Sequence, residues 1–455
     1  MPGLFGLLEL GRRALSAQSS AMNVTSHNIA NASTPGYTRQ RANLGATLPA
    51  LTAQGLFLGT GVNLDSIDRL RDRFIDMQYR QANTSLGSAS LRQSILSQIE
   101  AVLNEPSDSG LQSAMSSFFN SFQELANHPE ETGPRTNVLQ QATRLVQTFN
   151  RMSNSFTTQR NDLVEDVTRK VDRINQLTHD IGELNNQIVT MRGVGQEPSD
   201  LMDQRDLKLD ELSKLTNVSV SQDSQGSMLV SIGGTLVASN GSSLAIQVSV
   251  TAAEMKVSTV TGADVPVTGG ELSGVLDLYN NVIPGYMSQL DSLANTIITR
   301  VNAVHSAGYG LGNPPPTGVT FFTGNSAGNI GIYSQVASNT NFIAASSNGQ
   351  PGNNDTALAL FGITNERLLD GNTQTLSQYY GRFVSTVGSA LSSAEGETSG
   401  IELILGQLDA QRESVSGVSL DEEMTNLIRF QRSFEAAARV VNTANELFDT
   451  ILNMV

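Results

Sequence analysis

The final stretch of the chain, residues 419–455, carries apolar side chains at alternating steps of four and three. These positions are Leu420, Met424, Leu427, Phe434, Ala438, Val441, Phe448 and Leu452. Ser419 followed by Glu422 forms a capping box, in which the hydroxyl and the carboxylate each bond a free backbone N–H at the start of a helix. Neither Gly nor Pro interrupts the pattern. The stretch therefore predicts one long helix that packs along its length against a partner helix.

The first 30 residues have a similar pattern. Apolar side chains recur every seven residues at Met1, Leu8, Leu15, Met22 and Ile29. A seven-residue repeat is the spacing of a coiled coil, so we predict that the two ends of the chain pair with each other. The alternative is that each helix is an amphipathic piece of a globular core.

The middle of the chain is dominated by helical periodicity. One apolar face spans residues 111–125 and ends at His128-Pro129, and a much longer pattern predicts a helix from about 135 to 191. A break at residues 193–199 precedes a return helix. The return helix is predicted at residues 200–215, and further helices are predicted at 270–306, 373–394 and 398–415.

Residues 217–268 change to the alternating pattern of β-strands. Gly233-Gly234 and Asn240-Gly241 separate the alternating segments and predict hairpin turns. Residues 307–354 are rich in Gly, Asn, Ser and Pro, and predict loops with short strands near residues 321–322 and 342–344.

These patterns predict a mainly α fold with a small β part. We expect an elongated multi-domain rod, with the N- and C-terminal helices paired as a coiled coil, a long helical bundle as the body, and an inserted antiparallel β unit. The predicted domains are a terminal coiled-coil domain, a helical rod domain, the β unit and a loop-rich segment with short strands. Their bounds are 1–40 with 416–455, 41–216 with 270–306 and 370–415, 217–269, and 307–369.

Composition removes several classes of function. Charged residues make up only 16% of the chain, and the net charge of −15 argues against a partner made of nucleic acid. The absence of Cys excludes disulfides and Cys-based zinc sites, and the four His residues show no metal-binding spacing. No apolar run is long enough for a membrane helix, so no membrane association is expected, and the first residues lack the charge order of a cleaved signal peptide.

No catalytic pattern emerges either. Asp203 and Asp206 could supply the paired acids of a glycoside hydrolase, but with Arg205 between them we predict a solvated or capped helix face. We therefore expect no catalytic residue, no cofactor and no bound metal.

Two motifs carry a resemblance to a known family. Asn28 to Tyr37 reads NIANASTPGY, in which Pro35-Gly36 is a turn that ends the helix. This segment resembles the signature of flagellar axial proteins of the rod and hook type. Gly59-Thr60-Gly61-Val62, interpreted as a turn before a helix, leads into RLRDRFIDMQYRQAN. That stretch, with later segments, resembles the hook-associated protein 1 family over nearly the whole chain.

The resemblance implies a secreted structural subunit of the extracellular bacterial flagellum, at the junction of hook and filament. It implies self-assembly into a ring of copies, and contacts with the hook protein and a second hook–filament junction protein. It also implies type III export and a chaperone that binds the C-terminal helix. The expected assembly contacts are the apolar positions of both end helices and the turn motif: Leu8, Leu15, Met22, Ile29, Asn31, Thr34, Pro35, Gly36, Tyr37, Met424, Leu427, Phe434, Val441, Phe448 and Leu452.

Three other functions stay open from the sequence. The chain could be another axial subunit of the rod or hook. It could be an exported enzyme that cuts the cell wall, although that needs a cleft with paired acids. It could also be a coiled-coil adhesin that uses the β unit to bind a surface ligand.

Overall fold

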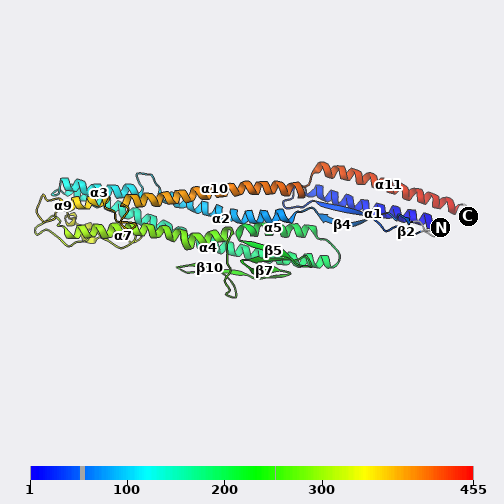
Figure 1. Ribbon diagram of the computed structural model, residues 1–455, viewed down its shortest axis with the longest axis horizontal. Helices are drawn as coiled ribbons and strands as arrows, with labels where there is room; N and C mark the ends of the chain where they lie inside the picture. Colours follow the sequence, from blue (N-terminus) through cyan, green and yellow to red (C-terminus); the bar gives the residue numbers. More distant parts are fainter. Residues whose placement is uncertain (1, 52–56, 252, 454–455) are drawn as a thin grey trace. The chain divides into compact units, whose positions relative to one another are not determined.

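The computed structural model describes residues 2–51, 57–251 and 253–453 (Figure 1). The described chain is mainly helical with short antiparallel strands, which confirms the predicted mainly α class with a small β part. It divides into two compact units. Unit 1 holds Met1–Ser85, Arg173–Ile246 and Ile401–Val455, and unit 2 holds Leu86–Asp172 and Gln247–Gly400.

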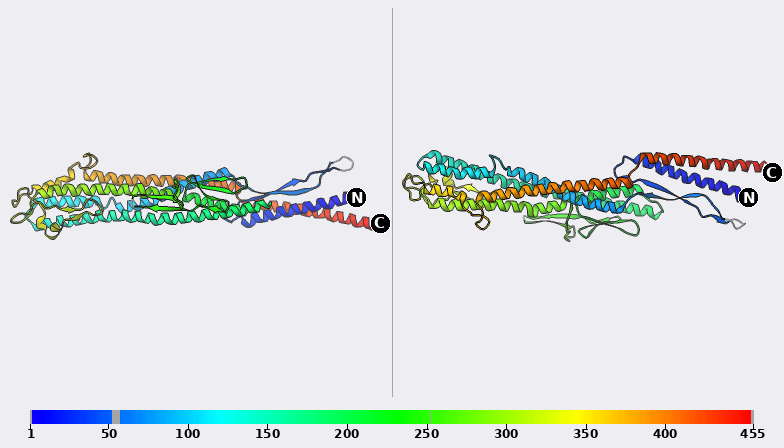
Figure 2. Two further views of the ribbon diagram at one scale, coloured as in Figure 1. Left: turned by 90° about the horizontal axis from the view of Figure 1, so that it is seen from below. Right: turned by 45° about the horizontal axis from the view of Figure 1, so that its top comes forward.

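The two ends of the chain lie side by side in unit 1 (Figures 1 and 2). Helix α1, Pro2–Asn31, packs along helix α11, Leu420–Leu452, as the matching patterns predict. Met1 and Val455, which the sequence patterns include, lie outside the described residues. The strands that follow α1 form an antiparallel ribbon that also contacts α1, and its tip is a second short pair. The strands are β1 Gln40–Ala46 with β4 Val62–Arg69, and β2 Ala50–Leu51 with β3 Phe57–Leu58.

The rest of unit 1 is a helical part with a small sheet. Helices α2, α4 and α10 contribute residues to both units, and α5 lies in unit 1 alone. Their bounds are Arg73–Leu103, Thr132–Gly193, Leu376–Ser416 and Ser199–Leu215. Strands β5 to β8 form a four-stranded antiparallel sheet with hairpin turns at the predicted Gly pairs. They span Val218–Gln222, Met228–Ile232, Thr235–Ser239 and Ser242–Ser243.

Unit 2 is built on the remaining lengths of α2, α4 and α10. Its own α-helices are α3 Leu111–Asn127, α6 Gly270–Asp277, α7 Ile283–Ala307, α8 Ser334–Ser338 and α9 Asp355–Gly362. A π-helical turn, Leu278–Val282, joins α6 to α7, and 3₁₀ turns span Thr340–Phe342 and Ile363–Asn365. Two short hairpins complete the unit, and their strands are β9 Ile246–Val250 with β10 Met255–Thr259, and β11 Phe322–Thr323 with β12 Gly331–Ile332.

The long helix α4 confirms the longest pattern in the sequence. It is 62 residues long, and its predicted apolar positions from Val138 to Ile188 are buried. Each side chain of this stripe is removed from water, and burial of a large apolar side chain is worth about 1.5–3 kcal/mol. A helix of this length is therefore stabilised by packing along one face rather than by intrinsic propensity.

Asparagine side chains fasten the strands to the helices. The carboxamide of Asn185 on α4 accepts a hydrogen bond from the backbone N–H of Met228 and donates to its carbonyl, at 3.0 and 2.7 Å. Asn175 binds Ile246 in the same way, and Asn280 binds Met255. A carboxamide offers one acceptor and two donors, so it satisfies both backbone groups of a strand residue on the side where no neighbouring strand bonds to them.

Two buried side chains, Arg135 and His305, bind the backbone of the loop-rich segment in unit 2. Arg135 on α4 donates to the carbonyl of Ile343 at 2.5 Å, and His305 Nε2 on α7 accepts from the N–H of Ala344 at 2.9 Å. His305 Nδ1 lies 2.8 Å from the carbonyl of Val319, to which it donates. A ring cluster in which Phe118 contacts Phe321 and Phe322 fills the space beside them. The backbone of these loops is thus satisfied without regular structure.

Three local predictions were wrong. Residues 342–344 form no strand, because the backbone of Ile343 and Ala344 bonds to the side chains of Arg135 and His305 instead. Residues 373–394 and 398–415 are not two helices, since α10 runs through both. Glycine in a helix costs only about 1 kcal/mol, less than the backbone bonds lost at a break. Residues 59–61 precede strand β4, which begins at Val62, rather than a helix.

The buried imidazole makes stability depend on pH. Burial lowers the pKa of His305 to about 4, and the charge of Arg135 acts in the same direction. The neutral form is therefore favoured by folding, so its contribution is full above the ordinary pKa near 6.5 and is lost as pH falls toward 4. We expect the free energy of unfolding, measured by urea titration, to fall by up to about 3 kcal/mol over this interval. His305→Asn should flatten the dependence, whereas the exposed His179→Asn should retain it.

Candidate assembly interface

Helices α1 and α11 run antiparallel. The ring of Phe5 meets the ring of Phe448 edge-on, with centroids 5.4 Å apart, and at the other end Asn28 bonds Glu423. Between these points Gly11 lies so close to α11 that a methyl group in its place would sit 2.4 Å from Val441 Cγ2. The contact therefore runs along the length of both helices.

Small side chains line this contact. Gly11, Ala17 and Ala21 of α1, with Ala437 and Ala444 of α11, are all buried. Small residues allow two helix backbones to approach closely, so contact area comes from the backbones as much as from side chains. The sequence pattern did not reveal this set, because alanine and glycine carry little hydrophobic signal.

The predicted apolar positions border the small residues. Leu8, Leu15, Met22 and Ile29 of α1 are half-buried, as are Leu427, Phe434, Val441 and Phe448 of α11. The structure brings Phe448 and Val441 against α1. Met424 and Leu452 are exposed, at 48% and 64%. These positions therefore keep apolar surface that α1 and α11 do not cover for each other.

A buried carboxylate joins the end of α1 to the start of α11. Glu423 is almost wholly buried, and its oxygens accept from Arg39 Nε at 2.8 Å and from Asn28 Nδ2 at 3.1 Å. The other arm of the arginine reaches Glu422, at 2.8 Å. Ser419 caps the helix, as predicted, by accepting from the N–H of Glu422. The second half of the predicted capping box was wrong, because the Glu422 carboxylate pairs with Arg39.

The Asn28–Tyr37 motif closes on itself around Asn28. The Asn28 side chain accepts from the Tyr37 hydroxyl at 2.7 Å and from the N–H of Gln40 at 3.0 Å, and it donates to the Gln40 carbonyl. Burial, and then the nearby carboxylate of Asp200, raise the pKa of Tyr37, so its hydroxyl stays a donor. The motif thus fixes the direction in which the chain leaves α1.

The turn itself has a second constraint. Gly36 has a φ of +77°, and a methyl group there would lie 2.4 Å from Leu207 Cγ of α5. Only glycine adopts this backbone freely and fits this space. Asn31 accepts from the Thr34 hydroxyl, and Thr34 and Pro35 remain exposed. Of the predicted motif contacts, Thr34, Pro35 and Gly36 are exposed, and the first two present side chains to a partner.

The structure corrects the prediction that Asp203, Arg205 and Asp206 form a solvated face. All three are buried. Asp203 pairs with Arg69, and Asp206 binds Arg69 at 2.9 Å. These residues belong to a larger cluster at the base of the ribbon, in which four arginines alternate with four aspartates: Arg69, Arg71, Arg80, Arg412, Asp76, Asp203, Asp206 and Asp210. The dense run of Arg and Asp in RLRDRFID was the sequence signal for this cluster. Apolar periodicity alone could not show that these charges pair with aspartates of α5.

The charges in this cluster are matched. Burial alone would raise the pKa of Asp206, but the positive charges of Arg71, Arg69 and Arg80 outweigh it and lower the pKa below its ordinary value. A glycoside hydrolase needs one carboxyl group with a raised pKa that stays protonated. Asp206 therefore does not fit the role of the protonated acid, and both carboxylates are buried and engaged by Arg69.

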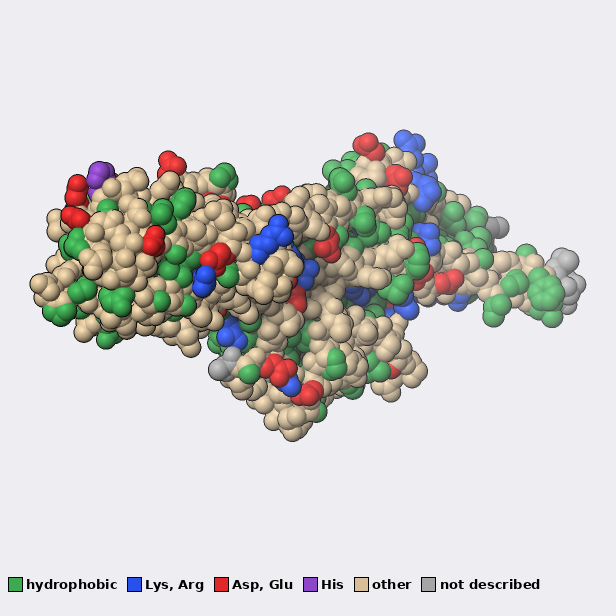
Figure 3. All heavy atoms as spheres, turned by 60° about the vertical axis from the view of Figure 1, so that its left-hand side comes forward, with side chains coloured by type: hydrophobic (Ala, Val, Ile, Leu, Met, Phe, Trp, Pro, Cys, Tyr) green, Lys and Arg blue, Asp and Glu red, His purple; other side chains and the backbone are tan. Residues whose placement is uncertain are grey.

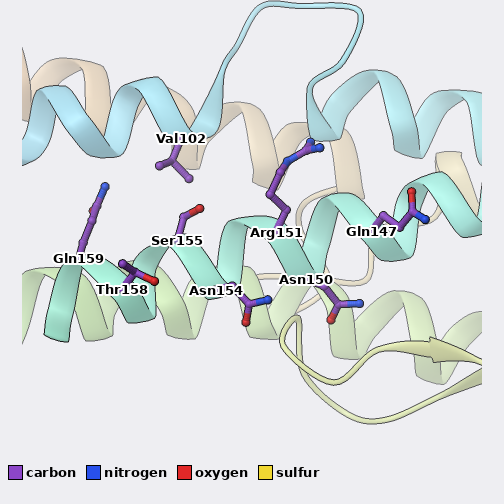
Figure 4. A pocket seen from close by; sticks show the side chains of 8 residues that line it. All are labelled: Val102, Gln147, Asn150, Arg151, Asn154, Ser155, Thr158 and Gln159. Carbon is purple, nitrogen blue, oxygen red and sulfur yellow. The ribbon is translucent and has the colours of Figure 1, made fainter. Parts of the chain in front are cut away.

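A groove in unit 2 also lacks such chemistry. Figure 4 shows a groove of about 670 Å³ lined by Val102 of α2 and by amide, hydroxyl and arginine side chains of α4, with no carboxylate among them. No group of three or more potential metal ligands occurs within residues 2–51, 57–251 and 253–453. Across the same residues no helix is long and apolar enough to cross a membrane.

The matched cluster predicts a loss of stability in acid. Because folding lowers the pKa of Asp206, its contribution is full above about pH 4 and is lost as pH falls through the lower folded-state pKa. Asp206→Asn should cost about 3 kcal/mol at pH 7 by leaving buried arginine charge unpaired. In urea titrations the variant should lose less stability than the parent between pH 5 and about pH 2.5. The exposed Asp162→Asn serves as control, and equal acid loss in all three proteins would contradict the assignment.

The close contact at Gly11 predicts a position-specific effect in α1. Gly11→Leu should force α1 and α11 apart at a cost of about 1–3 kcal/mol. Gly6→Leu has the same gain in helix propensity, and no atom lies within 4 Å of a methyl group built at Gly6. Hydrogen exchange of amides in residues 5–30 should therefore accelerate in Gly11→Leu alone. Equal exchange in both variants would show that the helices do not pack at this distance.

Three family models match this chain, and all three describe flagellar proteins. The family model for the flagellar hook-associated protein FlgK helical domain matches residues 96–322. Models for the flagella basal body rod protein and for the C-terminal part of the flagellar basal body rod FlgEFG protein match residues 8–38 and 410–454. The last two matches fall on α1 and α11.

Full-length relatives give the same result. The flagellar hook-associated protein 1 of Bacillus subtilis is 35% identical, over 100% of this chain and 99% of its own. The Salmonella typhimurium protein of the same name is 26% identical over 98% of this chain and 99% of its own. The solved structure of the flagellar hook junction protein FlgK from Burkholderia pseudomallei shares the fold, with a TM-score of 0.64 at 16% identity over 74% of this chain and 100% of that one. The chain therefore belongs to the flagellar hook-associated protein 1 family, whose members are structural proteins of the extracellular bacterial flagellum and not enzymes.

Proposed function

We propose that the paired terminal helices are the element by which this chain assembles at the hook–filament junction. As a member of its family, the chain is a structural component of that junction and assembles with copies of itself. The observation that carries the proposal is the apolar surface that α1 and α11 leave exposed. It comprises Phe5, Leu7, Leu420, Met424, Ile428, Val440, Leu447 and Leu452.

These exposed side chains flank the contact between the two helices. At 100° per residue, Leu420, Met424 and Ile428 lie on one side of the buried positions of α11, and Val440 and Leu447 lie on the other. Two different apolar flanks allow one neighbour on each side. Contacts between two different faces propagate from copy to copy, and they generate rings or helical arrays rather than closed dimers.

The finer contacts follow from the same surfaces. The apolar stripes of both helices would be completed by neighbouring copies in a ring. Thr34 and Pro35, exposed where the motif turns the chain out of α1, would face the hook protein. The opposite side of the ring would receive the second hook–filament junction protein. The domain bounds predicted from the sequence remain part of this proposal.

Export sets a further requirement. Apolar residues that neighbouring subunits cover only after assembly must be prevented from aggregating before it. We propose that a chaperone covers α11 during type III export, since six large apolar side chains are exposed on that helix: Leu420, Met424, Ile428, Val440, Leu447 and Leu452.

The assembly role predicts that a charge on either flank blocks incorporation. Ile428→Asp and Leu447→Asp place a carboxylate at an exposed position, so the free subunit should fold, with unchanged circular dichroism and melting. Burial of that unpaired charge against a neighbour should abolish filament formation in cells that lack the native gene. Thr443→Asp, exposed on the face between the two flanks, is the matched control and should assemble.

The deletion itself discriminates between axial positions. Cells without the gene should make a hook and no filament, because only the junction is missing. Loss of the hook as well would instead place the chain in the rod or hook. Normal filaments with Ile428→Asp and Leu447→Asp would refute assembly through these flanks.

A further inference from the structure

The tip of the β1–β4 ribbon is an exposed apolar surface that the terminal helices do not use. Its side chains are Leu48, Leu51, Phe57 and Leu58, which are 90%, 64%, 71% and 59% exposed. We call these four residues the ribbon tip; residues 52–56, between its two strands, are not part of it. Apolar side chains of this size rarely stay exposed together without a partner. In Figure 3, hydrophobic side chains are visible on the surface at the right-hand side.

Unit 1 also contains an unfilled groove between α2 and α10. Its volume is about 350 Å³. Ala82 and Leu408 provide apolar lining. Four glutamines from the two helices also line the groove: Gln78, Gln81, Gln407 and Gln411. Along the same helices, Phe74 and Met77 are 61% and 57% exposed at one end, and Leu403 and Ile404 are exposed at the other. We call this surface the α2–α10 groove.

We propose that the ribbon tip of one copy docks in the α2–α10 groove of a neighbouring copy. The inference rests on the proposed function, because it supplies a second contact for the same self-assembly. The distribution of charge favours a second copy of the chain as the partner. The chain carries a net charge of −15, so two copies repel each other wherever acidic faces meet. Residues 42–64 contain no charged side chain, and neither do the residues that line the groove.

The glutamines of the groove add a specific reason for a β-ribbon as the occupant. The outer edges of a two-stranded hairpin present backbone N–H and C=O groups without partners. Elsewhere in this chain, Asn185, Asn175 and Asn280 satisfy such groups from a helix. Glutamine has the same carboxamide on a longer side chain, so Gln81 and Gln407 can do so for an incoming ribbon.

The two surfaces cannot meet within one copy. Strand β4 runs for eight residues from the ribbon tip toward α2 and thus spans roughly 26 Å. Its last residue, Arg69, is anchored to Asp206 in the buried cluster at the base of the ribbon. The tip therefore points away from the helices that form the groove, and the contact joins two different surfaces of different copies.

Cross-linking tests the contact directly, because the chain has no native Cys. The full-length double variant Leu58→Cys with Gln407→Cys is expressed in cells lacking the native gene, and isolated flagella are oxidised. We expect disulfide-linked dimers and larger ladders of the subunit. Leu58→Cys with Leu236→Cys, which pairs the tip with an exposed site on β7, is the control and should stay monomeric. Ladders from the control, or none from the test pair, would overturn the proposal.

A charge exchange gives an independent readout. Leu58→Glu and Gln407→Lys should each reduce junction incorporation roughly tenfold, since each buries an unpaired charge in the contact. The double variant should recover incorporation, because the two charges then pair. The melting temperatures of the free subunits should not change, as both sites are at the surface. A double variant no better than the singles would count against docking.

The Ile428→Asp variant separates this inference from the proposed function. If Ile428→Asp blocks assembly while Leu58→Glu assembles normally, the terminal helices assemble the junction and the ribbon-tip contact is refuted. If Leu58→Glu blocks assembly and the double variant with Gln407→Lys restores it, the ribbon-tip contact stands whatever the effect of Ile428→Asp.

Discussion

The arrangement of the two chain ends depends on one buried carboxylate. Glu423 sits at the start of α11, where it is removed from water and needs hydrogen-bonding partners. Arg39, from the segment after α1, and Asn28, from α1 itself, supply them. Because both partners come from the first 40 residues, the charge fixes the register of the antiparallel pair. The small side chains around Gly11 then let the helices approach closely along that register.

The same principle recurs in both units: buried polar groups are paired with side chains rather than with regular structure. The cluster of four arginines and four aspartates fixes the base of the ribbon, and helix asparagines fasten single strand residues. Arg135 and His305 hold loops that lack strands of their own. An unpaired buried polar group costs about 1–3 kcal/mol, so each of these contacts strongly favours one local geometry. Local geometry is therefore specified where charges and amides are buried, whereas the exposed apolar side chains have no such partners within these contacts.

A junction subunit requires exposed apolar surface on its terminal helices. A protein that bridges two helical polymers must keep surfaces that only neighbouring subunits complete. Exposed apolar residues on both flanks of α11 meet this need without disturbing the pair, because the alanines and Glu423 that hold it lie on the inner face. In the proposed assembly, stability and self-association thus depend on different sides of the same helix.

The sequence by itself determined the class of fold, the long helix α4, the presence of antiparallel strands after residue 217 and the pairing of the two ends, because apolar periodicity reports which face of an element is buried. It also determined the family, through motifs such as Asn28–Tyr37. Only the tertiary structure decided which residues line the helix contact and how the charges pair. Alanine and glycine give only a weak apolar signal, and the partners of Glu423 and Asp206 lie more than a hundred residues away. Pairing at that separation depends on where the folded chain brings side chains together, which local pattern does not encode.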